Sequence, residues 1–432
     1  MLQNLGVNAS GNLTIGNVDT VSLAKKYGTP LYLLDEQVIC DNVMQYKNAI
    51  DKYYNKKGLV LYASKAFSSV YIYRLINTLG IGIDVVSGGE LYTALKAGFD
   101  TSKIYFHGNN KSYDELLMAM QNDVEVIVVD NENELSRLNS IAVNLNKKQK
   151  ILLRITPGID AHTHDFVKTG NIDSKFGFTL ENGDALRIIG TLSKYENLIY
   201  EGLHCHIGSQ IFDVMPFVEA SNVMLKLAKD IKDEFGYVTK KLNLGGGFGI
   251  KYVEGDDPIE YESYIEKVSQ NVKKLCKEFN LEMPFIIMEP GRSIIGPAGI
   301  TLYTVGNTKI IPNIRNYVSV DGGMSDNPRF ALYGSKYECL IANKASENKT
   351  TDVYTVAGKH CESGDFIAEN IHIQTPEYGD ILAVLATGAY NYSMASNYNM
   401  ATKPPVVVVS NGEDKLVIRR ETFEDLLNST EI

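Results

Sequence analysis

The first two thirds of the chain alternate short apolar runs with longer amphipathic stretches. The apolar runs have the length and composition of buried strands, and we expect strands at residues 60–63, 82–86, 104–107, 126–129, 151–155, 203–207, 241–244 and 286–289. The intervening segments are long enough for helices, for example at residues 68–79, 89–97, 112–121, 132–144 and 261–279. Eight such units predict a (β/α)8 barrel of the TIM type. A doubly wound open sheet is the competing arrangement, but the number of strands and the polar residues at their ends favour the barrel.

The pattern changes after Gly291, where helical stretches become few. Short β-type runs bounded by Gly, Asn, Asp and Pro follow at residues 303–305, 317–320, 353–357, 381–385, 406–409 and 415–418. They predict an all-β domain, a sandwich or barrel. Residues 13–18 and 31–34 are expected to pair with it, because they precede the first unit of the barrel. The predicted domains are therefore a barrel over 36–292 and a β-domain built from 1–35 and 293–432.

Composition narrows the class of protein. A chain of 432 residues is too long for one ordinary core, and its net charge of −10 argues against general nucleic-acid binding. No apolar run is long enough for a membrane helix, and the N-terminus lacks the features of a signal peptide. The five cysteines form no C-x-x-C pair, so we expect neither a metal site nor a disulfide framework. These features predict a cytoplasmic protein.

Lys65 is the first candidate for chemistry. The apolar run 59–63 ends at Ser64-Lys65-Ala66, which predicts a buried strand that presents one amine at its carboxyl end. An isolated lysine at such a place is usually a surface residue whose stem lies along apolar surface. An amine kept from water, however, gives up its proton more readily and can then form a Schiff base with a carbonyl compound such as pyridoxal phosphate.

Other predicted strands also end in polar residues. Asp84 lies inside an apolar strand, where a carboxylate is costly unless it is paired; taken alone, it would be a structural hydrogen-bonding group. His204 and His206 alternate along the sixth strand and are expected on the same side of it. No carboxylate or cysteine with metal-ligand spacing accompanies them, whereas the face of an imidazole can lie against a planar ring. Ser209, in the following loop, suits an anion.

The seventh and eighth strands end in Gly245-Gly246-Gly247-Phe248-Gly249 and Glu289-Pro290-Gly291-Arg292. The glycines do not have the spacing of the dinucleotide fingerprint, but they expose backbone N–H groups to a phosphate, and these barrel loops often bind phosphate. A glycine turn without a ligand is the alternative. Glu289 can hold a pyridine nitrogen protonated, and Arg292 can bind a carboxylate through a two-point fork, unless the two form a simple ion pair.

Over nearly its whole length the chain resembles the fold-type III PLP-dependent decarboxylases, and within them the diaminopimelate decarboxylases. The resemblance is carried by the motifs at residues 62–66 (YASKA), 204–210 (HCHIGSQ), 245–248 (GGGF), 289–292 (EPGR), 331–334 (ALYG), 361–365 (CESGD), 388–390 (GAY) and 169–177 (TGNIDSKFG). It implies a TIM-like barrel followed by a β-domain of the kind found in alanine racemases.

The resemblance also implies roles for individual residues. Lys65 would form the Schiff base, with Asp84 near it and His206 stacked on the pyridine ring. The phosphate would be held by Ser209, Gly246 and Gly247, with Gly291, Arg292 and Tyr390 close by, and Glu289 would face the ring nitrogen. The distal end of the substrate would be bound by Arg292, Arg329, Tyr333, Glu362 and Tyr390. Cys361 would donate a proton from the partner subunit of a homodimer.

The implied reaction is decarboxylation of meso-2,6-diaminopimelate to L-lysine and CO2, the last step of lysine biosynthesis. Two arginines beside Glu362 suit a substrate whose distal end is itself an amino acid, whereas ornithine or arginine would require acids there. The run Asn327-Pro328-Arg329 differs from the run expected ahead of Tyr333. Carboxynorspermidine decarboxylase, a PLP-dependent racemase with a tyrosine in place of Cys361, and a non-catalytic PLP-binding protein remain as alternatives.

Overall fold

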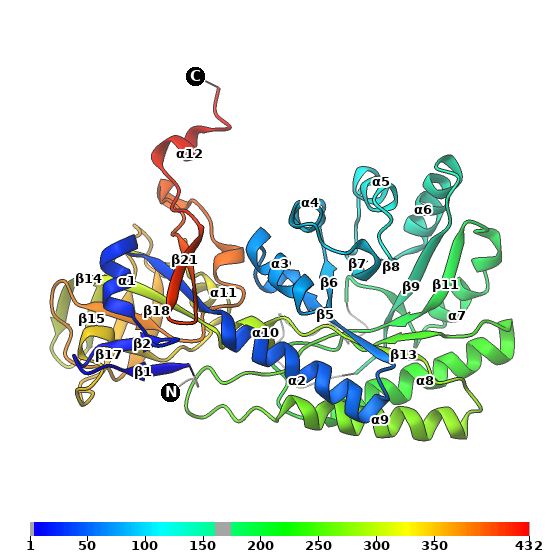
Figure 1. Cartoon of the computed structure of the whole chain (residues 1–432), viewed down its shortest axis with the longest axis horizontal. Coiled ribbons are helices and arrows are strands. Elements are labelled where there is room, and N and C mark those ends of the chain that lie inside the picture. The colour runs from blue at the N-terminus through cyan, green and yellow to red at the C-terminus, as the bar shows by residue number, and fades with distance from the viewer. Residues whose placement is uncertain (1–3, 160–173, 432) are drawn as a thin grey trace. The chain divides into compact units, whose positions relative to one another are not determined.

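The computed structural model describes residues 4–159 and 174–431, and they form two compact units (Figure 1). The barrel unit comprises Val43–Gly249 and Asp257–Gly291, apart from the undescribed residues. The β unit comprises the described parts of Met1–Asn42 and Arg292–Ile432 together with Ile250–Asp256. Relative to the domains expected from the sequence, residues 36–42 and 250–256 and Arg292 belong to the β unit.

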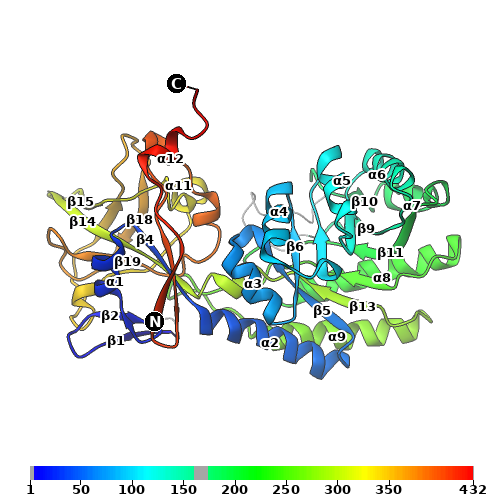
Figure 2. The same cartoon turned by 45° about the horizontal axis from the view of Figure 1, so that its top comes forward.

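The barrel unit is built on eight parallel strands, which Figures 1 and 2 show surrounded by helices. The strands are β5 (Gly58–Ala63), β6 (Gly82–Val85), β7 (Ile104–Phe106), β8 (Val126–Val129), β9 (Gln149–Thr156), β11 (Leu198–His204), β12 (Lys241–Asn243) and β13 (Phe285–Met288). Each pairs with the next, and β13 returns to pair with β5, so the sheet is closed. The predicted barrel is confirmed and the open sheet is excluded. A short strand that was not predicted, β10 (Phe178–Thr179), adds to β9.

Four helices of the barrel unit begin at residues whose side chains cap them. The helices around the barrel are α2 (Glu36–Tyr54), α3 (Val70–Thr78), α4 (Gly88–Ala97), α5 (Tyr113–Gln121), α6 (Glu132–Asn144), α7 (Asp184–Ile189), α8 (Met215–Phe235) and α9 (Tyr261–Glu278). Ser69, Ser87, Ser112 and Asn131 each accept a hydrogen bond from a backbone N–H of the first turn of α3, α4, α5 and α6. These caps satisfy N–H groups that the helix itself leaves unpaired. The five predicted helices are present, with ends that differ by a residue or two.

The sixth barrel strand differs from its prediction. It was expected over 203–207, but β11 begins at Leu198 and ends at His204. Its register shifts between Tyr200 and Gly202, and a Cβ at residue 202 would lie 1.9 Å from the carbonyl oxygen of Lys241. Only glycine permits this close approach of β12. His206 therefore lies beyond the strand, and the expected alternation with His204 on one strand is wrong.

The barrel interior is filled by apolar side chains from five different strands. They are Leu61, Tyr105, Val126, Val128, Leu152 and Ile287, none more than 2% exposed. Removing such a side chain from water stabilises the fold by about 1.5–3 kcal/mol. The interior is thus a packed core, and chemistry is left to the strand ends.

The β unit centres on one long strand, β14 (Gly299–Ile311), in a nine-stranded sheet. The other strands are β4 (Leu31–Asp35), β15 (Arg315–Val320), β16 (Cys339–Ile341), β17 (Tyr354–Ala357), β18 (Phe366–Ile371), β19 (Ile381–Val384), β20 (Val406–Ser410) and β21 (Glu413–Ile418). The first part of β14 pairs with β4 and β19, and its second part pairs with β15. The predicted β-domain and the pairing of residues 31–34 with it are confirmed.

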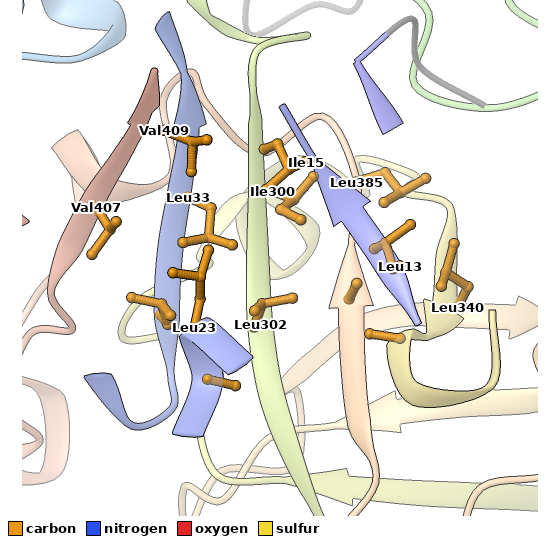
Figure 3. Packing of buried hydrophobic residues seen from close by; sticks show 14 residues of the cluster. Leu13, Ile15, Leu23, Leu33, Ile300, Leu302, Leu340, Leu385, Val407 and Val409 are labelled. Atoms are coloured by element: carbon orange, nitrogen blue, oxygen red, sulfur yellow. The ribbon is translucent and has the colours of Figure 1, made fainter. Parts of the chain in front are cut away.

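Residues 13–18 behave differently from the prediction, which paired them with this sheet. They form β2 (Leu13–Ile15) and β3 (Val18–Asp19), which pair with each other, and β2 also pairs with β1 (Leu5–Val7). Gly16 and Asn17 have positive φ angles of 53° and 66°, so they form a tight turn that folds the segment on itself. The small sheet still contributes to the core, because Leu13 and Ile15 pack against β4 and β14 (Figure 3).

The remaining helices of the β unit are short or peripheral. They are α1 (Thr20–Tyr27), α10 (Arg292–Ile295), α11 (Arg329–Tyr333) and α12 (Phe423–Leu427). Within residues 4–159 and 174–431, none of the helices combines the length and apolar character needed to cross a bilayer.

Candidate active site

Lys65 stands on a single 3-10 turn, Ser64–Ala66, directly after β5. Ser64 Oγ donates to Glu90 Oε2 at 2.5 Å, which ties this turn to α4. Lys65 itself is exposed. Lys65 thus follows the carboxyl end of a buried strand, as predicted, but the turn leaves it exposed rather than withdrawn from water.

Glu289 is the centre of a buried polar cluster at the carboxyl ends of the strands. It follows β13 and is 7% exposed. Asn243 Nδ2 donates to Glu289 Oε1 at 2.6 Å, His107 Nε2 lies 2.8 Å from the same oxygen, and His204 Nε2 lies 3.3 Å from Oε2. Burial alone would raise the pKa of Glu289, but the charge of His107 and these contacts bring it well below its ordinary value. The site thus holds a carboxylate that stays ionised although it is buried.

His107 and Asp84 form the second layer of this cluster. Burial lowers the pKa of His107, but the negative charges of Asp84 and Glu289 outweigh it, so the pKa is raised. Burial raises the pKa of Asp84 to about 6, with His107 opposing the shift. His107 Nε2 lies 3.9 Å from Asp84 Oδ1. The cluster therefore favours an imidazolium between two carboxylates.

The other two histidines are neutral. Burial lowers the pKa of His204 to about 4. Burial, and next the positive charge of Lys65, bring the pKa of His206 well below its ordinary value. The backbone N–H of Gly246 donates to His206 Nδ1 at 3.3 Å, so the single proton of this ring is on Nε2. Among the described residues, ligand atoms of His107, His204 and Glu289 lie close enough together to share a metal ion.

The glycine loop after β12 packs tightly on its neighbours. A Cβ at Gly246 would lie 2.1 Å from the carbonyl oxygen of Glu289, and one at Gly247 would lie 2.4 Å from that of Gly208. The loop is thereby pressed between the loop that carries Ser209 and the end of β13. Gly291 is similarly confined, because its Cβ would lie 2.8 Å from the Cβ of Ala63. The backbone N–H groups of Gly245 and Gly246 donate to Asn243 Oδ1 at 2.9 Å and to His206 Nδ1 at 3.3 Å.

The β unit brings together a second set of predicted residues. The guanidinium carbon of Arg292 lies 4.7 Å from the centre of the Tyr390 ring, and that of Arg329 lies 5.5 Å from it. Arg329 also lies 5.2 Å from the Tyr333 ring. Arg292 donates to the hydroxyl of Tyr252 at 2.6 Å. Both arginines are at least nine-tenths buried, and forked guanidinium groups of this kind suit a carboxylate or phosphate.

Cys361 and Glu362 lie on another loop of the β unit, after β17, and both are exposed. The N–H of Cys361 donates to Asn399 Oδ1 at 3.3 Å, and Tyr398 Oη donates to Glu362 Oε2 at 3.5 Å. All five cysteines lie in the described part of the chain, and Cys361 is the exposed one among them. A thiol and a carboxylate are therefore presented side by side to the surroundings of the β unit.

The predicted site residues thus fall into two groups. The barrel unit holds Lys65, Asp84, His206, Ser209, Gly246, Gly247, Glu289 and Gly291, and the β unit holds Arg292, Arg329, Tyr333, Cys361, Glu362 and Tyr390. Of the motif at 169–177, residues 169–173 lie outside the described residues. Its remaining part is ordered by Asp130, whose Oδ2 accepts from the N–H of Gly177 at 3.0 Å.

Three residues of these clusters were not assigned a role from the sequence: His107, Asn243 and Tyr252. His107 ends the third predicted strand, so the rule that strand ends carry the site could have found it. Asn243 lies two residues before the glycine run and resembles any polar residue in a strand. Nothing in the sequence around Tyr252 indicated a role, because that role depends on its contact with Arg292, which is far away in sequence.

The group in the barrel unit fits pyridoxal phosphate. Its ring nitrogen requires a buried ionised acid, which Glu289 provides. Its phosphate requires a backbone that it can approach closely, which the glycine loop provides. Lys65 supplies an exposed amine on the neighbouring strand end. The imidazole of His206 is uncharged and accepts a hydrogen bond at Nδ1. Such a neutral ring suits stacking on a pyridine ring.

Comparison with known proteins agrees with this site. Residues 39–296 match the pyridoxal-binding domain of pyridoxal-dependent decarboxylases. The chain is 51% identical over 415 residues to diaminopimelate decarboxylase of Bacillus methanolicus, covering 96% of each chain. It is 49% identical over 420 residues to that of Bacillus subtilis strain 168, covering 97% of this chain and 95% of the relative. A crystal structure of diaminopimelate decarboxylase from M. jannaschii with L-lysine superposes with a TM-score of 0.92 at 33% identity, covering 100% and 98% of the two chains.

Proposed function

The chain belongs to the family of pyridoxal-dependent decarboxylases, and on that premise we propose how its residues convert meso-2,6-diaminopimelate to L-lysine and CO2. The enzyme is a PLP-dependent carboxy-lyase, a diaminopimelate decarboxylase that completes lysine biosynthesis. The observation that carries the substrate is the pair of buried arginines around Tyr390. Identity of about half with named diaminopimelate decarboxylases, over nearly the full length of both chains, supports the same assignment.

Bound at the barrel mouth, PLP supplies an electron sink for the electron pair left when CO2 departs. Lys65 is the amine that holds the cofactor, and Asp84 lies within reach of its charge. Glu289 keeps a proton on the ring nitrogen because its own pKa is far too low to take that proton. His206 would lie against the ring. Ser209, Gly246 and Gly247 would hold the phosphate, with Gly291, Arg292 and Tyr390 beside it.

The distal end of the substrate is recognised by charge. Arg292, Arg329 and Tyr333 bind its carboxylate, with Tyr390 between the guanidinium groups, and Glu362 contacts its ammonium group. A forked guanidinium matches a carboxylate in two hydrogen bonds. A substrate such as ornithine has an amine but no carboxylate at its distal end. It would leave the two buried guanidinium groups without a counter-charge, and an unpaired buried charge costs more free energy than the loss of a weak contact. The site therefore discriminates by penalty as well as by attraction.

The remaining step is delivery of a proton. When the bond from Cα to the carboxylate breaks, CO2 leaves and a proton must take its place on Cα. The Cys361 thiol gives that proton and recovers one from solvent. Cys361 and Glu362 belong to the β unit and are exposed, which suits residues that complete the site of the partner subunit in a homodimer. The protein acts on small amino acids in the cytoplasm and needs neither nucleic acid nor a membrane.

A substrate panel tests this function. The purified holoenzyme is given meso-diaminopimelate, ornithine, arginine and carboxynorspermidine, and both CO2 and the amine product are quantified. We expect CO2 and L-lysine in equal amounts from meso-diaminopimelate and at least about a hundredfold lower kcat/KM for the other three. Faster turnover of ornithine or carboxynorspermidine would contradict the substrate. Inversion of an amino acid without CO2 would indicate a racemase, and absence of any turnover would indicate a non-catalytic PLP-binding protein.

A further inference from the structure

Two loops of the β unit leave the sheet at the same edge. β15 and β17 are parallel neighbours, with Ser319 opposite Ala357, so their carboxyl ends lie side by side. The loop after β15, residues 321–328, leads into α11 and to Arg329. The loop after β17, residues 358–365, carries Cys361 and Glu362. The sheet thus places the arginine that reads the substrate next to the loop that donates the proton.

Asp365 joins these two loops. It ends the second loop and is 2% exposed. Its Oδ1 accepts from the N–H of Met324 at 2.6 Å, and its Oδ2 accepts from the N–H of His360 at 2.8 Å. One carboxylate therefore bonds the backbone of both loops, and hydrogen bonds to an ionised acceptor are about twice as strong as neutral ones.

Both loops are shaped to receive this carboxylate. A Cβ at Gly323 would lie 2.5 Å from its Oδ1, and one at Gly358 would lie 2.1 Å from its Oδ2. Two further contacts join the same two loops, whose line of contact is called the seam here. The N–H of Lys359 donates to the carbonyl of Gly322 at 2.9 Å, and His360 Nε2 lies 2.8 Å from Ser325 Oγ. His360 directly precedes Cys361, so the seam fixes the start of the turn that carries the thiol.

We propose that Asp365 is a positioning residue that locks the loop of Cys361 and Glu362 to the loop of Arg329. The proposal rests on the proposed function, in which Arg329 serves one active site and Cys361 serves that of the partner subunit. The Asp365 bridge then sets the spacing between a substrate-binding group of one site and the proton donor of the other. An asparagine at 365 would turn an N–H2 group toward one of the two backbone donors, and a glutamate would not fit between the two glycines.

Asp365→Asn, with Asp380→Asn as its control, tests this bridge. Asp380 is also a buried carboxylate of the β unit, 6% exposed, and accepts from the N–H of Glu377 at 2.7 Å. In Asp365→Asn we expect unchanged cofactor absorbance, kcat/KM for meso-diaminopimelate lowered about ten- to a hundredfold, and faster amide hydrogen exchange in peptides 321–328 and 358–365 together. In Asp380→Asn we expect neither peptide to exchange faster and kcat/KM to stay within about twofold.

Ser325→Ala is the milder variant, which removes the contact of Ser325 Oγ with His360 and its hydrogen bond to Asp326 Oδ1 at 3.4 Å, but leaves the Asp365 carboxylate in place. It should lower kcat/KM about two- to tenfold and loosen the same two peptides. Unchanged exchange in both peptides of Asp365→Asn, or loosening that spreads over the whole β unit as it would in any unstable variant, would overturn the bridge. If the wild-type enzyme does not release CO2 from meso-diaminopimelate, the proposed function fails, while the exchange comparison still decides the bridge by itself.

Discussion

At the scale of single residues, the site depends on how burial and neighbouring charge compete. Burial alone would neutralise Glu289, but His107 and Asn243 keep it ionised. Because its folded pKa is depressed, Glu289 stabilises the fold above its unfolded value of about 4.3, and this stability is lost as the pH falls through the folded pKa. His107 has a raised pKa, so its stabilisation is complete below about 6.5 and is lost as the pH rises through the folded pKa.

The pairing of Glu289 with His107 predicts the outcome of Glu289→Gln. Without the carboxylate, only Asp84 opposes the effect of burial, so the pKa of His107 should fall. The free energy of unfolding should also drop, and the difference from wild type should be largest near pH 5.5, where both charges are present. An NMR titration of the His107 ring, with exposed His372 as internal reference, measures the first effect; urea unfolding at pH 5.5 and 8.5 measures the second. If the pKa of His107 is the same in Glu289→Gln and in the wild type, Glu289 does not stabilise the protonated form of His107.

At the scale of elements, the loops at the strand ends are held by buried contacts rather than by their sequence. Lys111, in the loop after β7 that begins with His107, is 2% exposed. Its Nζ donates to the carbonyls of Gly108 and Val128 at 2.8 Å each and to Glu134 Oε1 at 2.7 Å. All three protons of the ammonium group are therefore used. This lysine fastens the loop of His107 to β8 and α6.

The Lys111–Glu134 pair predicts a non-additive double variant. Lys111→Met leaves Glu134 buried without its counter-charge and should lower the free energy of unfolding by about 3–5 kcal/mol. Lys111→Met combined with Glu134→Leu should recover most of that loss, because no unpaired charge remains. Urea unfolding of the wild type, both single variants and the double variant measures the coupling. Additive losses would mean that the two side chains do not form the buried pair.

The glycine loop predicts a contrast between two substitutions. In Gly246→Ala the new Cβ would meet the carbonyl of Glu289 at 2.1 Å, so the loop must move away from β13. We expect its affinity for PLP to fall at least about tenfold, because the N–H groups that hold the phosphate move with it. Gly255→Ala is the control, since nothing lies within 4 Å of its Cβ. Cofactor titration followed by absorbance measures both; equal affinity in the two variants would show that the loop can give way.

The elements themselves were largely predictable, because burial imposes a pattern that the sequence carries. The eight barrel strands and the sheet of the β unit followed from apolar runs and their spacing. The exposure of Lys65 could not be predicted in this way, because a run of apolar residues does not tell whether the next residue continues the strand or turns out of it. Residues 13–18 failed for a similar reason: Gly16 and Asn17 allow a tight turn, and the segment pairs locally before it can join the larger sheet. Contacts such as that of Asn243 with Glu289 depend on residues far apart in sequence.

At the scale of the whole molecule, the groups of the proposed site belong to two units of the chain. Lys65 and Glu289 belong to the barrel unit, whereas Cys361 and Glu362 belong to the β unit and are exposed. An exposed thiol beside an exposed carboxylate does not form an enclosed site within a single chain. In a symmetric dimer each chain can lend these groups to its partner, so both sites are completed by the same contact.

Mixing two inactive variants tests this exchange. Lys65→Ala lacks a barrel group and Cys361→Ala lacks a β-unit group, so a hybrid dimer has one intact site. After subunit exchange we expect about a quarter of wild-type activity, because half of the dimers are hybrids and each has one site of two. Lys65→Ala mixed with Asp84→Ala, two defects in the same unit, is the control and should recover nothing. Absence of recovery in the first mixture would place Cys361 in the site of its own chain.

In the proposed function Lys65 holds PLP in a site that decarboxylates meso-diaminopimelate, so replacement of this lysine is the decisive test. Lys65→Ala should retain its fold by circular dichroism and lose both the cofactor absorbance and at least about a thousandfold of the rate at which CO2 and L-lysine appear. Lys103→Ala, which changes a lysine of the barrel unit outside the site, should keep both. A Lys65→Ala enzyme that still releases CO2 from meso-diaminopimelate at a rate close to wild type would contradict the account.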